Sequence, residues 1–416
     1  MSPRPVKLSE LAGLIDSDGL VYVAGASGAP MAFVSELLRE PDLTRDTRVL
    51  TTYVPGINSL DLSRFHPSAQ VTGLFMQPGF STAQRDGRFR ALPMSYSGFV
   101  RNLRDQVDID LAVLQVAAPD AHGQCSLGPA VEFMPIALTK TRRRLGLINS
   151  RTPALRGSVG VPYNQFDYIC EVDSDLPEYI TSVDPDTETV ARHIASFIED
   201  GSVLQLGLGK VPTALAASLR SRRKLRLHSG MLSDGFLDLA DVGALDMDYQ
   251  HTACVLVGSR GFYIRAGKFE PLRIRGCEFT HDLVTLASMQ RLVAVNSALE
   301  VDLFGQCNLE HANGSAVSGV GGAADFARAA RLSPGGRSIV ALNARHRSGS
   351  RIVPTLGSPG VTSLSRIDVD FVVTEFGVAQ LAGASVHERA QSLIEVAAPE
   401  HRSVLRDRWR DVARTL

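Results

Sequence analysis

The sequence predicts an α/β protein made of two related open domains with largely parallel sheets. Short apolar runs alternate with amphipathic segments along the chain, which is the pattern of strands connected by helices in parallel sheets. The chain has 416 residues, which is long for a single core, so two domains are expected. A unit of strand, glycine-rich turn and helix also occurs once in each half.

The repeated unit combines a buried apolar strand with a turn in which glycines allow close backbone packing. In the first half it comprises the strand Leu20–Ala24, the loop Gly25–Pro30 and the helix Ala32–Leu38. In the second half it comprises the strand Val203–Leu206, the loop Gly207–Pro212 and the helix Thr213–Leu219. This repetition indicates two halves of related fold.

Apolar runs of strand length continue through the second half, and helical patterns occur at 323–330 and 387–396. The expected strands are 253–257, 292–296, 338–342 and 371–374. The segment 173–185 is rich in Asp, Pro, Ser and Glu and reads as the linker. We therefore expect domains at 1–180 and 186–416.

Charge and cysteine content exclude several classes of protein. Lysine plus arginine total 43 and aspartate plus glutamate total 44. The chain therefore has no excess of positive charge that would favour binding to nucleic acid or to an acidic membrane. The five cysteines are scattered without a CxxC pair, which is typical of reduced thiols in a cytosolic protein. There is no long apolar segment, no metal-spaced His/Cys cluster and no nicotinamide or flavin fingerprint. We expect a cytoplasmic protein that neither binds a metal nor crosses a membrane.

Six motifs occur in one order between about residue 20 and residue 402. They are Gln115–Gly123 with Ser126–Gly128, Leu204–Gly209 with Pro212, Val295–Gln306, Ser318–Gly322 with Asp325–Phe326, Ser350–Pro354, and Val372–Ala379. Together they resemble the acetyl-CoA hydrolase/transferase family, which includes 4-hydroxybutyrate, butyrate and succinate CoA-transferases. A single glycine-rich loop would be weak evidence, whereas six ordered motifs are specific.

The resemblance implies two α/β domains with an active site at their interface, acyl-CoA as the substrate, and a homodimer or higher homo-oligomer. Enzymes of this kind transfer CoA from an acyl-CoA to a free carboxylate. A glutamate attacks the thioester, and a glutamyl-CoA thioester forms as the intermediate. Covalent catalysis of this type divides one difficult exchange into two easier steps.

Two glycine-rich loops are candidates for binding the reacting thioester. The loop with Gly319, Gly321 and Gly322 can turn its N–H groups outward ahead of a helix, as an oxyanion hole requires. A second set follows a strand end, where open parallel sheets bind ligands, and we assign it to the acyl or CoA pocket. Its members are Gln205, Gly207 and Gly209.

Four further residues are assigned to the site. Gly25 and Ser27 belong to the first-half loop that corresponds to the Gln205 loop, and Met231 lies in the segment Leu227–Gly235. These three residues are predicted to line the substrate pocket. Glu375 follows an apolar strand, and the resemblance places the corresponding glutamate in the active site, where it helps to hold catalytic groups.

The chain departs from the family at its nucleophile. The family pattern has glutamate where this sequence has Gly230, and glycine has no side chain that can attack a thioester. The residues around Gly230 match the pattern. A second departure accompanies the first, because His281 stands where relatives carry an active-site asparagine.

The two changes are interpreted together. Loss of the glutamate leaves space for water or another acceptor, and an imidazole is suited to general-base work near neutral pH. Glu375 and Asp282 are both candidates to orient the ring. The hypothesis is that His281 activates water or another nucleophile against an acyl-CoA held by the glycine loop.

Three functions stay open at this point. The first is hydrolysis of the thioester, or acyl transfer, without a glutamyl-CoA intermediate. The second is an acyl-CoA:carboxylate CoA-transferase with an unidentified nucleophile. Ser229, Cys277 and Asp234 are weak candidates for that nucleophile, because an ordinary structural role explains each of them better. The third is a catalytically inactive CoA-binding regulatory protein. The acyl group and the acceptor (water, carboxylate or another nucleophile) stay open as well.

Overall fold

The chain forms two compact units, and the computed structural model describes residues 2–346, 349–357 and 359–416. The first unit contains the chain up to Ile180, together with His251–Thr280 and Ala316–Gly321. The second contains Thr181–Gln250, His281–Ser315 and Gly322–Leu416. Each unit is an α/β layer structure around a largely parallel sheet.

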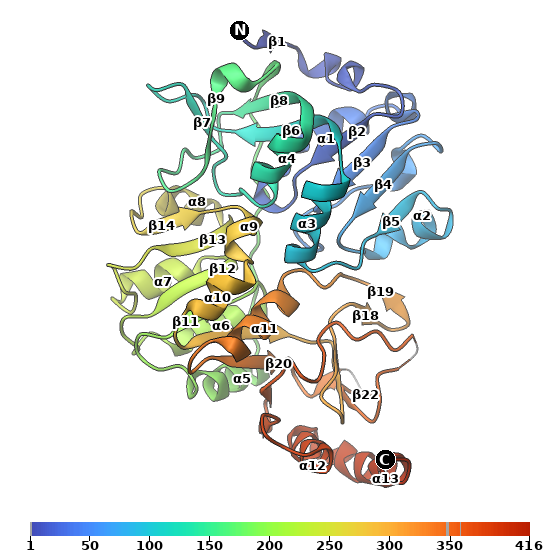
Figure 1. Cartoon of the computed structure of the whole chain (residues 1–416), viewed down its shortest axis with the longest axis vertical. Coiled ribbons are helices and arrows are strands. Elements are labelled where there is room, and N and C mark those ends of the chain that lie inside the picture. The colour runs from blue at the N-terminus through green and yellow to red at the C-terminus, as the bar shows by residue number, and fades with distance from the viewer. Residues whose placement is uncertain (1, 347–348, 358) are drawn as a thin grey trace. The chain divides into compact units, whose positions relative to one another are not determined.

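The sheet of the first unit is fully parallel and has β6 and β2 near its centre (Figure 1). β6 is an almost continuous apolar run, as expected for a strand covered on both faces. The order is β1 (Arg4–Pro5), β10 (Tyr168–Val172), β8 (Thr141–Asn149), β6 (Ile109–Val116), β2 (Leu20–Val23), β3 (Arg48–Thr51), β4 (Gln70–Gly73), β5 (Phe89–Ala91).

Helices of the first unit lie between these strands along the chain. They are α1 (Met31–Leu37), α2 (Ser81–Arg85), α3 (Tyr96–Gln106) and α4 (Met134–Lys140). A small antiparallel pair joins β7 (Gln124–Ser126) to β9 (Gly160–Pro162). The predicted unit of strand, glycine loop and helix near the N-terminus is confirmed by β2 and α1.

One segment packs with the first unit although a division at 1–180 and 186–416 assigns it to the second domain. It contains β13 (His251–Leu256), α8 (Arg260–Ala266), β14 (Leu272–Ile274) and α9 (Cys277–Thr280). Backbone hydrogen bonds join β13 to the chain around Pro129, with Leu256 N donating to Pro129 O at 2.7 Å and Val131 N to Cys254 O at 3.0 Å. Non-local backbone pairing of this kind leaves no compositional signal in the sequence.

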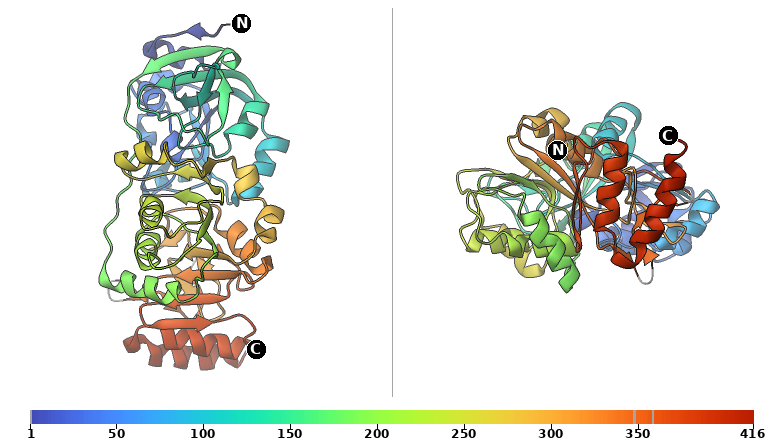
Figure 2. Two further views of the ribbon diagram at one scale, coloured as in Figure 1. Left: turned by 90° about the vertical axis from the view of Figure 1, so that its left-hand side faces the viewer. Right: turned by 90° about the horizontal axis from the view of Figure 1, so that it is seen from below.

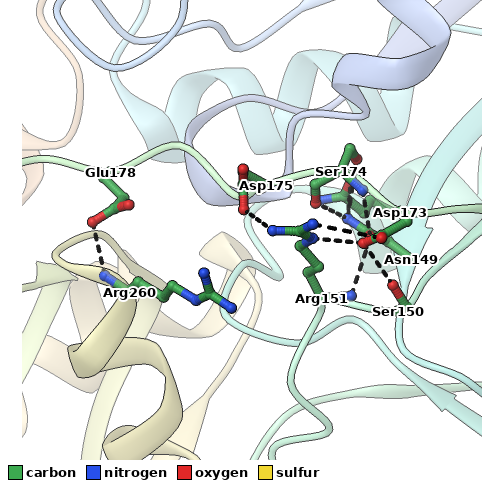
Figure 3. Close-up of polar contacts among 9 residues, drawn as sticks. Asn149, Ser150, Arg151, Asp173, Ser174, Asp175, Glu178 and Arg260 are labelled. Carbon is green, nitrogen blue, oxygen red and sulfur yellow. Dashed lines mark hydrogen bonds and ion pairs between the residues drawn. The ribbon is translucent and has the colours of Figure 1, made fainter.

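The predicted linker is irregular from 173 to 184, and its first part is attached to the first unit (Figure 3). Arg151 donates to Asp173 and to Asp175 at 2.5 and 2.6 Å. Further along, Glu178 accepts a hydrogen bond from the backbone N–H of Arg260 at 2.9 Å. These contacts fix the segment up to Ile180, where the first unit ends.

The second unit has a parallel sheet with one antiparallel edge strand. The strands of this sheet that belong to the second unit have the order β12 (Arg226–Leu232), β11 (Val203–Gln205), β15 (Leu292–Ser297), β20 (Arg337–Ala341), β24 (Phe371–Thr374) and β25 (Gly377–Gln380). The strands predicted at 203–206, 292–296, 338–342 and 371–374 are confirmed within one residue at each end.

Seven helices of described residues complete this unit. They are α5 (Pro185–Ala195), α6 (Lys210–Ser218), α7 (Gly235–Asp241), α10 (Leu283–Ser288), α11 (Ala323–Leu332), α12 (Val386–Val396) and α13 (Pro399–Ala413). The last two lie side by side (Figure 2). α6 begins three residues before the predicted Thr213, because Pro212 is tolerated in the first turn of a helix.

Short strands occur outside the two main sheets. They are β16 (Glu300–Asp302), β17 (Cys307–Asn308), β18 (His311–Ala312), β19 (Ser315–Ala316), β21 (Arg345–His346), β22 (Gly349–Ser350) and β23 (Ile352–Val353). Among the described residues, no helix has both the length and the apolar content needed to cross a membrane.

Candidate functional site

Three neighbouring strands of the second unit bring polar residues to one face of the sheet. Leu204 pairs with Leu227, and Gln205 pairs with Ala294. Side chains at alternate positions of a strand share a face. Gln205 of β11, Gly230 of β12 and Asn296 of β15 therefore lie on the same face, near the carboxyl ends of their strands, where open parallel sheets bind ligands.

Two of these residues carry buried amide atoms without a protein partner. Gln205 Oε1 and Asn296 Nδ2 have no hydrogen bond among the described residues, and the two side chains are only 4% and 9% exposed. An unsatisfied buried polar atom costs about 1–3 kcal/mol. Such atoms next to a strand end are positioned to bind a ligand. Gln205 was predicted as a site residue, whereas Asn296 was not singled out by its sequence.

The space beside Gly230 is occupied by the imidazole of His281. A Cβ atom at Gly230 would lie 3.2 Å from Nε2 and 3.3 Å from Cε1 of this histidine, and 3.8 Å from the ring of Phe326. A longer side chain at Gly230 would need the imidazole to move. The space that was expected beside Gly230 is thus filled by the imidazole ring of His281.

His281 lies between α9 and α10 and is 1% exposed. Its ring packs edge-on against Phe326, with 4.9 Å between ring centroids. Burial, with a smaller contribution from the nearby imidazole of His228, lowers the pKa of His281 to about 3. The ring is therefore neutral at physiological pH, which is the protonation state that a base requires.

His281 also contacts the glycine loop. A Cβ atom at Gly322 would lie only 2.3 Å from Nε2 of His281, so no other residue fits at Gly322 without displacing the ring. Gly322 precedes α11, the helix that carries Phe326. One imidazole nitrogen thus lies beside both Gly230 and Gly322, the last glycine of the predicted oxyanion loop.

The other two glycines of this loop belong to the first unit. A Cβ atom at Gly319 would overlap the carbonyl oxygen of Leu74 at 2.1 Å, and Gly321 has φ of +58°, which favours glycine. Gly321 O accepts a hydrogen bond from Tyr96 N at 3.2 Å. Because a trans peptide directs its C=O and N–H oppositely, the N–H of Gly322 points away from Tyr96.

The Gln205 loop continues into α6 through two glycines. Gly209 has φ of +119° and begins the helix, and a Cβ atom at Gly207 would have no neighbour within 4 Å. Met231 follows Gly230 on β12, so its side chain faces the other side of the sheet, where it lines a small pocket together with Gly207.

In the first unit, the two residues assigned to the substrate pocket have structural partners. A Cβ atom at Gly25 would overlap the carbonyl oxygen of Thr52 at 2.1 Å. Ser27 is fully buried, and its hydroxyl donates to Leu256 O at 2.7 Å.

The chain belongs to the acetyl-CoA hydrolase/transferase family. The model of the N-terminal domain of that family matches residues 4–181, and the model of the C-terminal domain matches residues 258–409. The chain is 29% identical to the 4-hydroxybutyrate coenzyme A transferase of Clostridium kluyveri, over 95% of both chains. It is 30% identical to the succinyl-CoA:cyclohexane-1-carboxylate CoA transferase of Geobacter metallireducens, over 84% of this chain and 82% of that one.

A hydrolase and a solved structure are also similar. The acetyl-CoA hydrolase of Saccharomyces cerevisiae is 26% identical over 76% of this chain and 68% of its own length. The crystal structure of RipA from Yersinia pestis is similar with a TM-score of 0.90 and 25% identity, over 99% of this chain and 98% of that one. The resemblance in the sequence motifs is confirmed, and this protein is an enzyme of the transferase or hydrolase type, in a family whose substrates are CoA thioesters.

Glu375, which the family pattern places in the active site, lies in the turn between β24 and β25. Its Oε2 accepts a hydrogen bond from Ala344 N at 2.7 Å, and its buried Oε1 has no hydrogen-bond partner among the described residues. The carboxylate thus supports the loop after β20 and keeps one oxygen available. Asp282 accepts from the backbone N–H and hydroxyl of Thr285, both at 2.7 Å, so it caps α10.

The weaker nucleophile candidates have structural roles. Ser229 is fully buried, and its hydroxyl bonds to the backbone N–H and carbonyl of Leu206. Cys277 is buried, and burial together with the thiol of Cys254 raises its pKa well above the usual range, which opposes thiolate formation. Asp234 precedes α7 at the N-cap position.

We expect Gly322→Ala to destabilise the second unit by about 1–3 kcal/mol, because the added methyl group overlaps His281. The chain has one tryptophan, Trp409, which lies in the second unit, so its fluorescence during urea unfolding reports this unit. Gly207→Ala is the matched control, since Gly207 belongs to the same unit and nothing lies within 4 Å of the added atom. The loss should shrink in a His281→Ala background; an equal loss in both backgrounds would contradict the steric account.

Acid should destabilise the wild type more than His281→Asn. The folded pKa of about 3 is below the unfolded value of ~6.5, so the unfolded state binds more protons between these values and stability falls as the pH falls. From pH 7 to pH 5 the wild type should lose about 2 kcal/mol more than the variant. The measurement is urea unfolding followed by Trp409 fluorescence, and parallel curves for the two proteins would refute the shifted pKa of His281.

Proposed function

We propose that this enzyme hydrolyses an acyl-CoA thioester, or transfers its acyl group, without a glutamyl-CoA intermediate. The observation that carries the proposal is the pairing of Gly230 with His281: the position of the nucleophile has no side chain, and an imidazole nitrogen takes the space beside it. The relatives named as CoA-transferases and acetyl-CoA hydrolases support the substrate class.

In the proposed mechanism, His281 is the general base. Its Nε2 takes a proton from an acceptor such as water as the acceptor oxygen attacks the thioester carbonyl carbon. The resulting oxyanion accepts hydrogen bonds from N–H groups of the Gly319–Gly322 loop. When the C–S bond breaks, the proton passes from His281 to the CoA thiolate, and the products are the free acid and CoA.

The low pKa of His281 follows from burial in the ligand-free protein. An acceptor water beside the ring removes part of that desolvation, which moves the pKa toward ~6.5. We therefore expect a base of useful strength only when the acceptor is bound. The buried amides of Gln205 and Asn296 are proposed to bind the polar groups of the substrate, and Glu375 is proposed to support the site through the loop at Ala344.

A specific observation favours a second candidate. His281 is 1% exposed and packed against Phe326. The same burial is expected of a catalytically inactive protein in which the imidazole does not reach a substrate. In that case the protein binds CoA or acyl-CoA and acts through a partner. A carboxylate-dependent CoA-transferase with another nucleophile is the third outcome of the test below.

The decisive assay measures thiol release and acyl exchange from a panel of acyl-CoAs, with and without carboxylate acceptors. Thiol release without an acceptor, reduced at least tenfold in His281→Ala, is expected. The rate should fall as the pH falls through the pKa of the ligand-bound imidazole. Exchange that strictly needs a carboxylate would favour the CoA-transferase, and CoA binding without turnover would favour the regulatory protein. Unchanged turnover in His281→Ala would overturn the mechanism.

Restoring the family residue should require two changes. In Gly230→Glu alone, the new side chain meets His281 within 3.2–3.3 Å of its Cβ atom, so little carboxylate-dependent exchange is expected. The double variant Gly230→Glu/His281→Asn removes the ring and should gain exchange activity that neither single variant has. Trapping of a glutamyl-CoA adduct by mass spectrometry checks this. Equal exchange in the single and double variants would show that His281 does not block the position.

A further inference from the structure

The loop Gly25–Pro30, which follows β2 in the first unit, is held by side chains from three distant segments. Gly25 N donates to Thr52 Oγ1 at 2.9 Å, and Ala26 N donates to Asn58 Oδ1 at 2.6 Å. Gly25 N also lies 3.3 Å from Oε2 of Glu132. Because several side chains accept hydrogen bonds from this loop, its conformation depends on the position and protonation of those side chains.

Backbone strain is concentrated at both sides of this contact. Glu132 has φ of +43° and Ala26 has φ of +48°, a region that non-glycine residues rarely adopt. Strained backbone of this kind costs on the order of 1–3 kcal/mol and occurs mainly at functional sites. The sequence does not single out Glu132, because its neighbours along the chain are apolar. Its positive φ leaves no pattern in the sequence either, since the residue is a glutamate and not a glycine.

The carboxyl group of Glu132 is buried and incompletely paired. The residue is 1% exposed. Its Oε2 accepts from Thr52 Oγ1 at 2.7 Å and from Gly25 N, while Oε1 has no hydrogen-bond partner among the described residues. A buried carboxylate without a cation is unfavourable, so the neutral form is stabilised.

Among the described residues, the titratable groups that face Glu132 are phenols and thiols. They belong to Tyr22 of β2, Tyr96 of α3, Cys254 of β13 and Cys277 of α9. No cation among the described residues shifts the pKa of Glu132. Burial raises the pKa of Glu132 to about 7, and the hydrogen bonds from Thr52 and Gly25 oppose the shift.

We infer that Glu132 is a positioning residue that holds the Gly25–Pro30 loop closed while its carboxyl group is protonated and releases the loop when that group ionises. The part that the loop plays in substrate binding rests on the proposed function, whereas its dependence on Glu132 does not. Opening of the loop gives an ionised carboxylate in this position access to water, because Oε2 of Glu132 contacts Gly25 N within the loop.

The size of the effect follows from linkage. With a pKa of about 7 in the closed loop and an ordinary value of ~4.3 in the open loop, the closed state binds more protons between these values. The opening equilibrium therefore rises with pH, by about tenfold between pH 6 and pH 8.

Hydrogen exchange of the full chain, read by mass spectrometry on peptides covering residues 20–34, tests the inference. After correction for the intrinsic pH dependence of exchange, opening in the wild type should rise about tenfold from pH 6 to pH 8. In Glu132→Gln, a neutral group of the same shape, it should stay low and constant. Glu36→Gln is the matched control, because Glu36 is a buried glutamate of α1 paired with Arg39 at 3.1 Å, and it should keep the wild-type response.

Two results would overturn the inference: a pH response that persists in Glu132→Gln, or a wild type whose loop opening does not change with pH. Carboxyl carbon NMR of the wild type keeps the inference testable if the variant does not fold, since a Glu132 titration midpoint below about 5.5 would also refute it. None of these readouts needs turnover. Failure of the proposed acyl-CoA chemistry would therefore leave this test unaffected, and failure here would leave that chemistry intact.

Discussion

The contact between the His281 imidazole and two glycines is the constraint on which the rest of the second-unit site depends. A Cβ atom at Gly322 would lie 2.3 Å from Nε2 of His281, which excludes an ordinary side chain at this position. A Cβ atom at Gly230 would lie 3.2 Å from the same nitrogen, so a side chain there requires displacement of the ring. Interiors are close-packed, so a residue lost on one side of a site is balanced by volume gained on the other. The imidazole of His281 fills the volume beside Gly230 and Gly322 in this way.

The contact between His281 and Gly230 also carries the proposed chemistry. In that proposal a neutral imidazole accepts a proton and leaves the acyl group to an external acceptor, whereas a nucleophilic carboxylate would form a covalent intermediate. The chain has the architecture of the acetyl-CoA hydrolase/transferase family, and Gly230 and His281 lie side by side within it.

Among the described residues, both units contain buried polar side-chain atoms without a hydrogen-bond partner. In the second unit they include atoms of Gln205 and Asn296 near strand ends, and in the first unit they include an oxygen of Glu132 next to the Gly25–Pro30 loop. Each such atom lowers the stability of the ligand-free protein. The cores of both units are filled with apolar side chains, whereas these polar atoms lower the stability near strand ends. Such a local loss of stability is typical of sites that bind ligands. Glu132 adds titration near neutral pH to this pattern.

The sequence by itself determined the fold class and the family. Strands such as Val203–Gln205 and Phe371–Thr374 were predictable because apolar runs bounded by glycine are local signals, and the ordered motifs identified the family. Only the tertiary structure decided that His281 fills the space beside Gly230 and that Asp282 caps a helix. It also decided that residues 251–280 pack with the first unit and that Glu132 is buried. These properties arise from contacts between segments far apart in the chain, where burial and close approach set side-chain position and pKa, and no local pattern of residues encodes them.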